Sequence, residues 1–488
     1  MRTTILELEK KARLLDPPPQ MRNEWNTAVQ AYADDFLKDI ETAKGYTTSE
    51  GQGKGVLELN FDQPKPLDQL LEVLKKEVDD QGINAAAGSH LGYIPGGGIY
   101  PTAMGDYLAA ITNRYVGMFF ASPGGVRMEN QLIRWMNDLV GYPSNALGNL
   151  TSGGSIANLI AIVSARDAKG ITSKKVDKAV IYLTEQVHHC VQKAIRIAGL
   201  SEATIRYIPM DERFRMDADF LEVQARIDAK NGLIPFMVVG SAGTTDVGAI
   251  DPLNRIADVA EEHDMWYHVD AAYGGFFLLA DAQNQEGQAI QKSFEGIERS
   301  DSVAIDPHKG LFLAYGVGAV LIKNVKAMMD AHFYRANYMQ DATDFNPSDE
   351  PNPADLSPEL TKHFRGLRMW LPLHLFGIEP FKAALTEKIM LCRYFYEEVQ
   401  KLGFEVGPYP ELSVAVYRYV PTTTANANAF NEALLGHLQR DGRIFVSSTN
   451  IKGAFWIRIA ILSFRTHLQH IDLFLEMLKE GVAHLQEK

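Results

Sequence analysis

Short apolar runs alternate with amphipathic helical stretches from about residue 90 to residue 380 of this 488-residue chain. Continuous apolar runs of this kind are typical of strands buried on both faces, and a helix between two such strands makes them parallel. The pattern therefore predicts an α/β fold, in which helices cover a mostly parallel sheet. The clearest runs are Ala179-Val180-Ile181-Tyr182-Leu183, Phe236-Met237-Val238-Val239-Gly240 and Gly318-Ala319-Val320-Leu321-Ile322.

Two other patterns flank this central region. Residues 1–85 contain helical stretches that break at Asp16-Pro17-Pro18-Pro19 and have too little apolar surface for a core of their own. We expect an arm of short helices that packs on something larger. Residues 86–380 would form the large α/β domain. After a further helical stretch, alternating runs predict a small α+β domain over residues 381–488.

Composition and charge exclude several classes of protein. No apolar run approaches the ~20 residues that span a bilayer, and the N-terminus lacks the pattern of a signal peptide, so we expect a cytoplasmic protein without a membrane partner. Two cysteines, Cys190 and Cys392, are too few for a disulfide framework or a zinc cluster, so we expect no metal. The net charge of −13 disfavours nucleic acid as a partner.

Lys309 and Asp270 are the first candidate pair for chemistry. Each follows or ends an apolar run, so both are predicted at the carboxyl ends of strands, where open α/β sheets bind ligands. A lysine that forms a Schiff base with an aldehyde cofactor avoids the ~4 kcal/mol needed to hold its amine neutral at pH 7. A carboxylate beside the ring nitrogen of pyridoxal phosphate would keep that nitrogen protonated. Alternatively, Lys309 is a surface lysine and Asp270 is a helix cap.

A glycine-rich segment, Asn149-Leu150-Thr151-Ser152-Gly153-Gly154-Ser155, precedes a run of helical character. Glycines allow an anion to approach the backbone, Ser155 is a favourable N-cap, and a helix N-terminus attracts phosphate. The segment lacks the ending of a P-loop and the spaced glycines of a dinucleotide fingerprint. It therefore predicts a phosphate cup, although taken alone it also fits an ordinary turn before a helix.

These motifs together resemble those of the fold-type I pyridoxal phosphate enzymes, and among them the group II amino-acid decarboxylases, which include the aromatic-L-amino-acid decarboxylases. Asp306-Pro307-His308-Lys309 resembles the family's Schiff-base lysine motif, and His268-Val269-Asp270-Ala271-Ala272-Tyr273-Gly274-Gly275 resembles its pyridinium-partner motif. The resemblance covers roughly residues 65–470. It implies a seven-stranded sheet, an N-terminal helical arm, a small C-terminal α+β domain, pyridoxal 5'-phosphate as cofactor, and a homodimer with active sites at the interface.

The resemblance also assigns roles to further residues. His188 would stack on the cofactor ring, with the neighbouring His189 as the alternative, and Ala272 would contact the other face. Tyr338 would protonate Cα after CO₂ leaves, and the polar composition of residues 344–358 predicts a mobile lid beside it. The residues implied in catalysis are Lys309, His188, Tyr338 and Asp270, and those implied in cofactor binding are Gly153, Gly154, Ser155, His188, Thr244, Asp270, Ala272, His308 and Lys309.

Arg458, Tyr93 and Pro95 are the substrate-binding residues that the resemblance implies. Arg458 lies within an apolar strand pattern, where an unpaired guanidinium is expensive to bury, so we expect it to have an anionic partner. In the family that partner would be the substrate carboxylate; alternatively, Arg458 lies on an edge strand and faces water. Tyr93 and Pro95 would line the substrate pocket, but Tyr93 and Tyr100 could instead be core or interface aromatics.

The implied function is pyridoxal phosphate-dependent decarboxylation of an L-amino acid to its amine and CO₂. Tyr93 and Ile94 favour an aromatic substrate: tryptophan, tyrosine, phenylalanine or DOPA. The run Ala85-Ala86-Ala87 and Gly96 depart from the family, whose aromatic decarboxylases have a large aromatic residue and a hydroxyl-bearing residue, respectively, at these places. The open alternatives are a decarboxylase of histidine, glutamate or 2,4-diaminobutyrate, an aldehyde synthase (which Tyr338 disfavours), an aminotransferase, and a cofactor-binding scaffold without turnover.

Overall fold

A mixed β-sheet lies at the centre of the protein, seen here in a computed structural model that describes residues 1–49, 51–334, 350–421 and 426–487. Within these residues the sheet has seven strands in the order β3-β9-β8-β7-β6-β4-β5. β9 runs antiparallel to both of its neighbours, and the other pairs are parallel, which confirms the predicted sheet. The strands are β3 (Leu147–Thr151), β4 (Ala179–Leu183), β5 (Thr204–Tyr207), β6 (Ile234–Ser241), β7 (Trp266–Asp270), β8 (Ser302–Ile305) and β9 (Gly318–Ile322).

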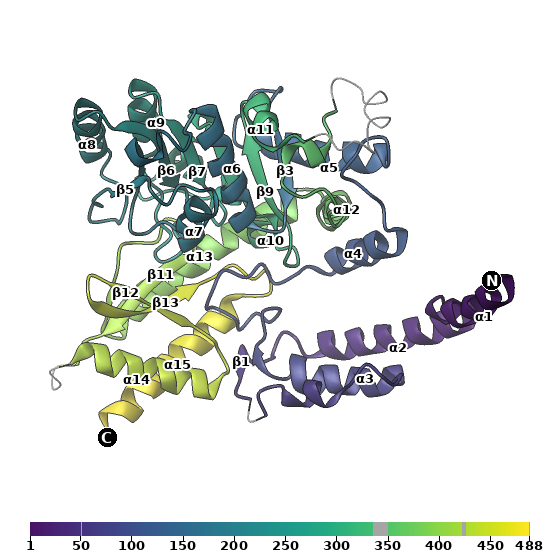
Figure 1. Ribbon diagram of the computed structural model, residues 1–488. Helices are drawn as coiled ribbons and strands as arrows, with labels where there is room; N and C mark the ends of the chain where they lie inside the picture. Colours follow the sequence, from purple (N-terminus) through teal and green to yellow (C-terminus); the bar gives the residue numbers. More distant parts are fainter. Residues whose placement is uncertain (50, 335–349, 422–425, 488) are drawn as a thin grey trace.

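Helices cover this sheet (Figure 1). Every residue of β3, β4, β7, β8 and β9 is buried, so both faces of these strands are shielded from water. This burial explains why the strands appear in the sequence as continuous apolar runs. The helices of this region are α4 (Tyr100–Thr112), α5 (Pro123–Leu139), α6 (Gly154–Ala168), α7 (His189–Ile197), α8 (Ala218–Lys230), α9 (Leu253–Glu262), α10 (Pro307–Gly310), α11 (Val325–His332) and α12 (Gly366–Phe376).

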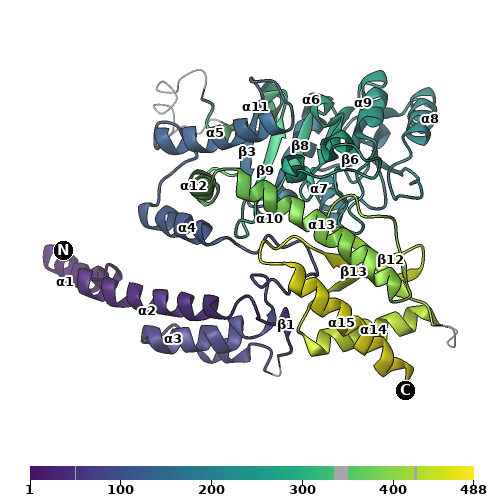
Figure 2. The ribbon, with the colours of Figure 1, turned by 180° about the vertical axis from the view of Figure 1, so that it is seen from behind.

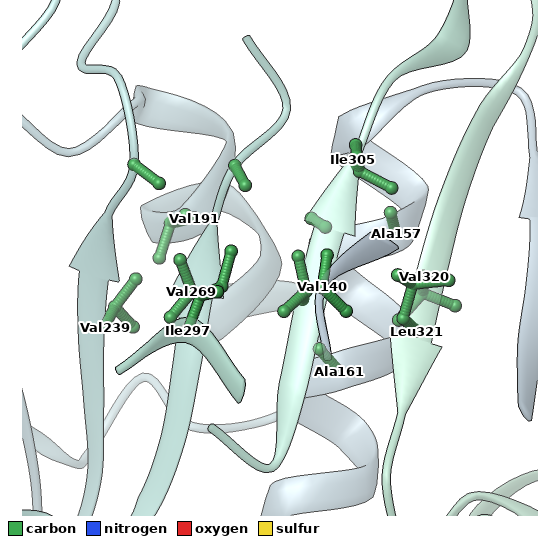
Figure 3. Close-up of a cluster of buried hydrophobic side chains, with 14 of the residues drawn as sticks. Val140, Ala157, Ala161, Val191, Val239, Val269, Ile297, Ile305, Val320 and Leu321 are labelled. Carbon is green, nitrogen blue, oxygen red and sulfur yellow. The ribbon is translucent and has the colours of Figure 1, made fainter. Parts of the chain in front are cut away.

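The core between α6 and the sheet is made of small and β-branched side chains (Figure 3). Ala157 and Ala161 lie one turn apart on α6 and are fully buried. They allow the helix to approach β8 and β9, where Ile305 and Val320 are also fully buried. This close approach brings the N-terminus of α6 to the carboxyl end of the sheet.

A second, smaller sheet lies in the C-terminal region and confirms the predicted α+β character there. Its strands are antiparallel and ordered β10-β11-β13-β12. α13 begins at Glu379, so the predicted boundary between residues 380 and 381 would fall at the start of this helix. The elements are α13 (Glu379–Lys401), β10 (Phe404–Val406), β11 (Val414–Tyr419), α14 (Ala427–Asp441), β12 (Ser447–Ile451), β13 (Ala454–Ala460) and α15 (Leu468–Gln486).

The N-terminal arm projects away from the rest of the molecule (Figures 1 and 2). The chain breaks before Pro19, as the run of prolines predicts, but the helix that follows has 20 residues and is not short. None of the residues of its three α-helices is buried. No helix in the described parts of the chain is long and apolar enough to cross a membrane. The arm comprises α1 (Arg2–Ala12), α2 (Pro19–Lys38) and α3 (Leu67–Leu74), with β1 (Tyr46–Thr47) paired to β2 (Gly82–Ile83).

The described part of the predicted lid, residues 350–358, is packed against its surroundings. Glu350 is 3% exposed and accepts hydrogen bonds from Arg127 and Arg134 of α5 and from the amide of Asn130. Leu356 is fully buried nearby in the sequence. Polar composition does not prevent packing here because α5 supplies charged and amide partners for Glu350, and the mobility of the lid remains a prediction. Residues 344–349 lie outside the described residues.

A buried ion pair attaches the segment before α12 to α5. Lys362 Nζ lies 2.9 Å from Glu129 Oε2 and donates to Asn149 Oδ1 at 2.8 Å, and the two charged side chains are 1% and 2% exposed. Removal of one partner leaves the other charge buried without compensation.

We predict that Lys362→Ala lowers the free energy of unfolding by about 3–5 kcal/mol. Chemical denaturation followed by circular dichroism measures this loss. The control is Lys401→Ala, which removes an exposed lysine whose side chain is 67% accessible and should cost less than ~1 kcal/mol. Equal losses of unfolding free energy in the two variants would show that the buried ion pair stabilises the fold no more than an exposed lysine does.

Candidate active site

A cavity of about 340 Å³ opens where the strands β3, β4, β6, β7 and β8 end. Parallel strands present their carboxyl ends at one edge of the sheet, and ligands bind there in open α/β folds. β9 runs the opposite way, so the segment before it, with Tyr315, reaches the same edge. Every residue that the sequence predicts to contact a cofactor lines this cavity: Gly153, Gly154, Ser155, His188, Thr244, Asp270, Ala272, His308 and Lys309.

The predicted phosphate cup is the first turn of α6. The helix begins at Gly154 with Gly153 as N-cap, so the expectation that Ser155 is the N-cap was wrong by two residues. The correction follows from the turn out of β3, where Thr151 Oγ1 accepts from the N–H of Gly153 and leaves Ser155 inside the first turn. Unpaired N–H groups of this turn therefore face the cavity, with the positive end of the helix dipole behind them.

Asp270 receives a chain of hydrogen bonds that starts on β7 itself. Trp266 Nε1 donates to Ser302 Oγ at 2.8 Å, and Ser302 Oγ is 2.8 Å from His268 Nδ1. His268 Nε2 is 2.7 Å from Asn158 Oδ1, and Asn158 Nδ2 lies 3.4 Å from Asp270 Oδ2. Side chains two apart on a strand share a face of the sheet, so His268 and Asp270 both point toward α6.

The donor and acceptor roles along this chain of hydrogen bonds can be assigned in only one way. Burial lowers the pKa of His268 to about 4, so its imidazole is neutral and has a single N–H. Asn158 Nδ2 also donates to the carbonyl of Gly154, which assigns its Oδ1 as the acceptor. His268 must therefore donate through Nε2 and accept from Ser302 through Nδ1. The amide of Asn158 is thus oriented so that it donates to Asp270.

Burial raises the pKa of Asp270, and this effect outweighs the opposing influence of His268, Lys309 and the N–H of Ala272. A buried carboxylate in this condition favours a positive charge or an N–H donor beside it. A protonated pyridine nitrogen would supply both.

Lys309 follows directly on the end of β8, in the short helix α10. Its Nζ lies 3.0 Å from Oδ2 of Asp306, a carboxylate that is itself 1% exposed. Burial lowers the pKa of Lys309, but the charges of Asp306 and Asp270 more than offset this, so its pKa is raised. The sequence pointed to Lys309 but not to this pairing.

His188 is the histidine that lines the cavity, whereas the adjacent His189 is exposed. His188 caps α7, where its Nδ1 accepts from the N–H of Cys190 at 3.3 Å. Burial, together with His189 and Lys309, lowers the pKa of His188 to about 4. A neutral imidazole on the wall of the cavity is suited to stack on an aromatic ring.

Thr244 and His308 lie on the cavity wall, and one hydrogen bond to the backbone holds the side chain of each. Thr244 Oγ1 accepts from the N–H of Ala249 at 3.0 Å. His308 Nδ1 donates to the carbonyl of Val317 at 2.6 Å, and burial lowers the pKa of this histidine, so its Nε2 is left as an acceptor.

Arg458 does not line the cavity, and among the described residues its hydrogen bonds go to neutral acceptors. Its guanidinium, 3% exposed, donates to the carbonyl oxygens of Gly92, Thr245 and Asp246 at 2.5–3.2 Å, and to Ser447 Oγ at 3.2 Å. Carbonyl groups offset the burial cost of this cation here, and the substrate carboxylate implied as its anionic partner remains a prediction.

The other two residues predicted to bind substrate, Tyr93 and Pro95, do not line the cavity within one chain. Tyr93 is 58% exposed and packs against His90 and Phe445, and Pro95 is buried beside it. Tyr338 lies outside the described residues. Their roles remain predictions.

The cavity fits a phosphorylated pyridine aldehyde. It combines an anion-binding helix end, a lysine amine, a carboxylate and a neutral histidine around one space. A Cβ on Gly154 would lie 3.0 Å from Asp306 Oδ2 and 3.2 Å from the Cβ of Ala272, so glycine keeps the wall of the cavity open.

The comparisons with known proteins agree with this geometry. Residues 56–420 match the family described as "Pyridoxal-dependent decarboxylase conserved domain". The chain is 32% identical over 431 residues to an aromatic-L-amino-acid decarboxylase of Bacillus atrophaeus, with 87% of each protein covered. It is 28% identical over 422 residues to an L-2,4-diaminobutyrate decarboxylase of Acinetobacter baumannii, with 81% and 78% covered. The crystal structure of Catharanthus roseus tryptophan decarboxylase in complex with L-tryptophan is similar, with a TM-score of 0.87 at 21% identity and coverage of 96% and 99%.

Fold and cavity thus define a pyridoxal phosphate enzyme of the α/β class. The chain belongs to the pyridoxal-dependent decarboxylase family, a family of amino-acid carboxy-lyases. Pyridoxal 5'-phosphate is its cofactor, as the sequence predicted. The relatives are named for different amino acids, so membership alone does not determine the substrate.

We predict that Asn158→Ala weakens the binding of pyridoxal phosphate about 5- to 150-fold, because it leaves buried groups of Asp270 and His268 without partners at a cost of ~1–3 kcal/mol. Fluorescence titration of the cofactor-free protein measures the affinity. Asn431→Ala is the control, since Asn431 is a fully buried helix asparagine of α14 that bonds to Tyr419 and lies outside the cavity lining. Equal affinities in wild type and Asn158→Ala would refute the role of the chain of hydrogen bonds.

Proposed function

We propose that this protein decarboxylates an aromatic L-amino acid, releasing CO₂ and the corresponding amine. The single observation that supports it most is the meeting of Lys309, Asp270 and the first turn of α6 around one cavity. Family membership supplies the reaction type, and the relative from Bacillus atrophaeus supports the aromatic class.

The residues of the cavity divide the work of holding the reacting groups. Pyridoxal phosphate supplies an electron-accepting ring when bound. Lys309 would attach it through Nζ, and Asp270 would hold a proton on the ring nitrogen. The N–H groups of Gly154 and Ser155, next to Gly153, would bind the phosphate, and the neutral imidazole of His188 would cover one face of the ring.

Two further roles in this proposal rest on the family resemblance. Tyr338 would return a proton to Cα after CO₂ has left. Arg458 would orient the substrate carboxylate. Its Nη2 donates one hydrogen bond, to the carbonyl of Thr245, and the second N–H of Nη2 has no partner among the described residues. That remaining donor is compatible with a carboxylate contact.

A second cavity supports the proposal that the substrate has an aromatic side chain. It has a volume of about 170 Å³ and is lined by small and apolar residues that include Ala85, Gly96 and Leu313, with no charged side chain among those that line it. Tyr315 lines both this cavity and the first. An uncharged space of this kind suits a ring better than the carboxylate of glutamate or the second amine of diaminobutyrate.

We also propose that the enzyme is a cytoplasmic homodimer. The arm exposes apolar side chains such as Leu15 (89%) and Trp25 (45%), and Ile111 of α4 is 67% exposed. Such an apolar surface is typical of a face covered by a second copy. The two cysteines are buried and unpaired, which supports a reducing compartment.

Lys309→Ala should abolish both covalent attachment of the cofactor and amine formation, because no other group replaces Nζ. Borohydride reduction followed by peptide mass spectrometry locates the attachment. Lys326→Ala, which removes an exposed lysine of α11, should leave both unchanged. Attachment that persists in Lys309→Ala would place the Schiff base elsewhere.

The purified, cofactor-loaded protein should release amine and CO₂ from at least one of tryptophan, tyrosine, phenylalanine and DOPA, and at least tenfold more slowly from histidine, glutamate and 2,4-diaminobutyrate. Product identification by mass spectrometry with CO₂ trapping measures this. Preference for a non-aromatic substrate would contradict the substrate class. Aldehyde or keto acid as the product would contradict the reaction.

A further inference from the structure

We propose that Asp306 is a positioning residue that holds Lys309 as an ammonium ion in the cofactor-free protein and so sets the pH at which the cofactor is captured covalently. This inference rests on the proposed role of Lys309 as the attachment point. It assigns a task to a residue that neither the cofactor cup nor the ring-nitrogen contact uses.

The pair is built into the start of α10. Asp306 is the N-cap of this helix and Lys309 lies three residues later, one turn along. This spacing places Asp306 Oδ2 3.0 Å from Lys309 Nζ. The side chain of Asp306 is 1% exposed and that of Lys309 is 25% exposed, so the carboxylate side of the contact is shielded from water and salt.

The surroundings of Asp306 offer little other compensation for its charge. Its Oδ1 is buried without a hydrogen-bond partner in the described part of the chain. His308 Nε2 is 3.7 Å from Oδ2, but burial lowers the pKa of this histidine and keeps it neutral. Lys309 is therefore the cation that balances this carboxylate.

Two glycines define the position of this carboxylate. A Cβ on Gly318 would lie 2.6 Å from Asp306 Oδ1, and a Cβ on Gly154 would lie 3.0 Å from Oδ2. Side chains at these positions would displace the carboxylate from Lys309. The backbone of β9 and the first turn of α6 thus make room for the ion pair.

Groups from several elements face Lys309, and their effects differ in sign. Asp270 from β7 favours the ammonium, as does Asp306, whereas burial and the neighbouring His308 give it no support. Three further groups line the cavity and carry no charge near neutral pH. His188 is a neutral imidazole at the start of α7, and burial together with Asp270 raises the pKa of the Cys190 thiol. Burial also raises the pKa of Tyr315, which precedes β9. The two carboxylates are therefore what keeps the lysine protonated.

Covalent capture requires the opposite state of Lys309. The ammonium first loses one proton to solvent, and the freed lone pair of Nζ forms a bond to the aldehyde carbon of the cofactor. The aldehyde oxygen then leaves as water, taking the two protons that remain on the nitrogen. Any group that stabilises the ammonium moves this reaction to higher pH.

The test measures capture of pyridoxal phosphate by the cofactor-free, full-length protein between pH 5 and pH 10. The rate of formation of the borohydride-stable adduct at Lys309 gives a midpoint pH. Asp306→Asn should move this midpoint down by about 1–3 pH units, because burial then acts with one opposing carboxylate fewer. Asp306→Ser is measured in parallel as a second uncharged variant, and Asp306→Glu should retain the midpoint of the wild type.

Pyridoxamine phosphate, which has no aldehyde, reports noncovalent binding and should bind to each folded variant at every pH. Asp228→Asn removes a buried carboxylate that pairs with Arg206 away from the cavity lining and is the matched control, with no expected shift. A midpoint unchanged in both uncharged variants that bind pyridoxamine phosphate would overturn the inference. Absence of an adduct at Lys309 in the wild type would instead overturn the proposed function, and this inference with it.

Discussion

The burial of Asp270 is the constraint on which the rest of the site depends. A carboxylate at the end of a central strand has no water to solvate it, so the protein must supply donors from neighbouring elements. It does so through a chain that joins β8, β7 and α6 by way of Ser302, His268 and Asn158. This chain requires α6 to lie close to the sheet, which the alanines on its inner face permit. The same approach delivers the helix N-terminus to the cavity, so ring-nitrogen site and phosphate site are set by one packing contact.

Charge balance within the cavity follows from the same constraint. Two buried carboxylates, Asp270 and Asp306, flank a single lysine, and both neighbouring histidines that line the space are neutral. The cofactor-free cavity is therefore short of one positive charge. A ligand that brings a protonated ring nitrogen beside Asp270 corrects the deficit at one carboxylate, while Lys309 corrects it at the other. The two sides of the cavity therefore accept opposite charges. The side with Asp270 favours the protonated ring nitrogen, and the first turn of α6 favours the phosphate.

The sequence predicted the sheet well because buried parallel strands appear as continuous apolar runs, and β4 and β9 coincide with the runs that indicated them. It also predicted which residues line the cavity, since strand ends converge in this fold. It missed Asn158, although that residue lies one helical turn after Gly154 on the same face. It could not reveal that backbone carbonyls accept hydrogen bonds from the guanidinium of Arg458, because composition carries no information on such contacts. The packing of Glu350 was missed for a similar reason: its arginine partners are more than 200 residues away in the sequence.

Arg458 has a mechanical consequence. Its strand belongs to the small C-terminal sheet, yet its guanidinium bonds to the carbonyls of Thr245 and Asp246, next to the cavity residue Thr244, and to that of Gly92. These hydrogen bonds join the small sheet to three backbone groups, one of which, the carbonyl of Thr245, belongs to a residue of the cavity wall. We therefore expect the small sheet and this wall of the cavity to move together, if they move at all, because one buried side chain joins them.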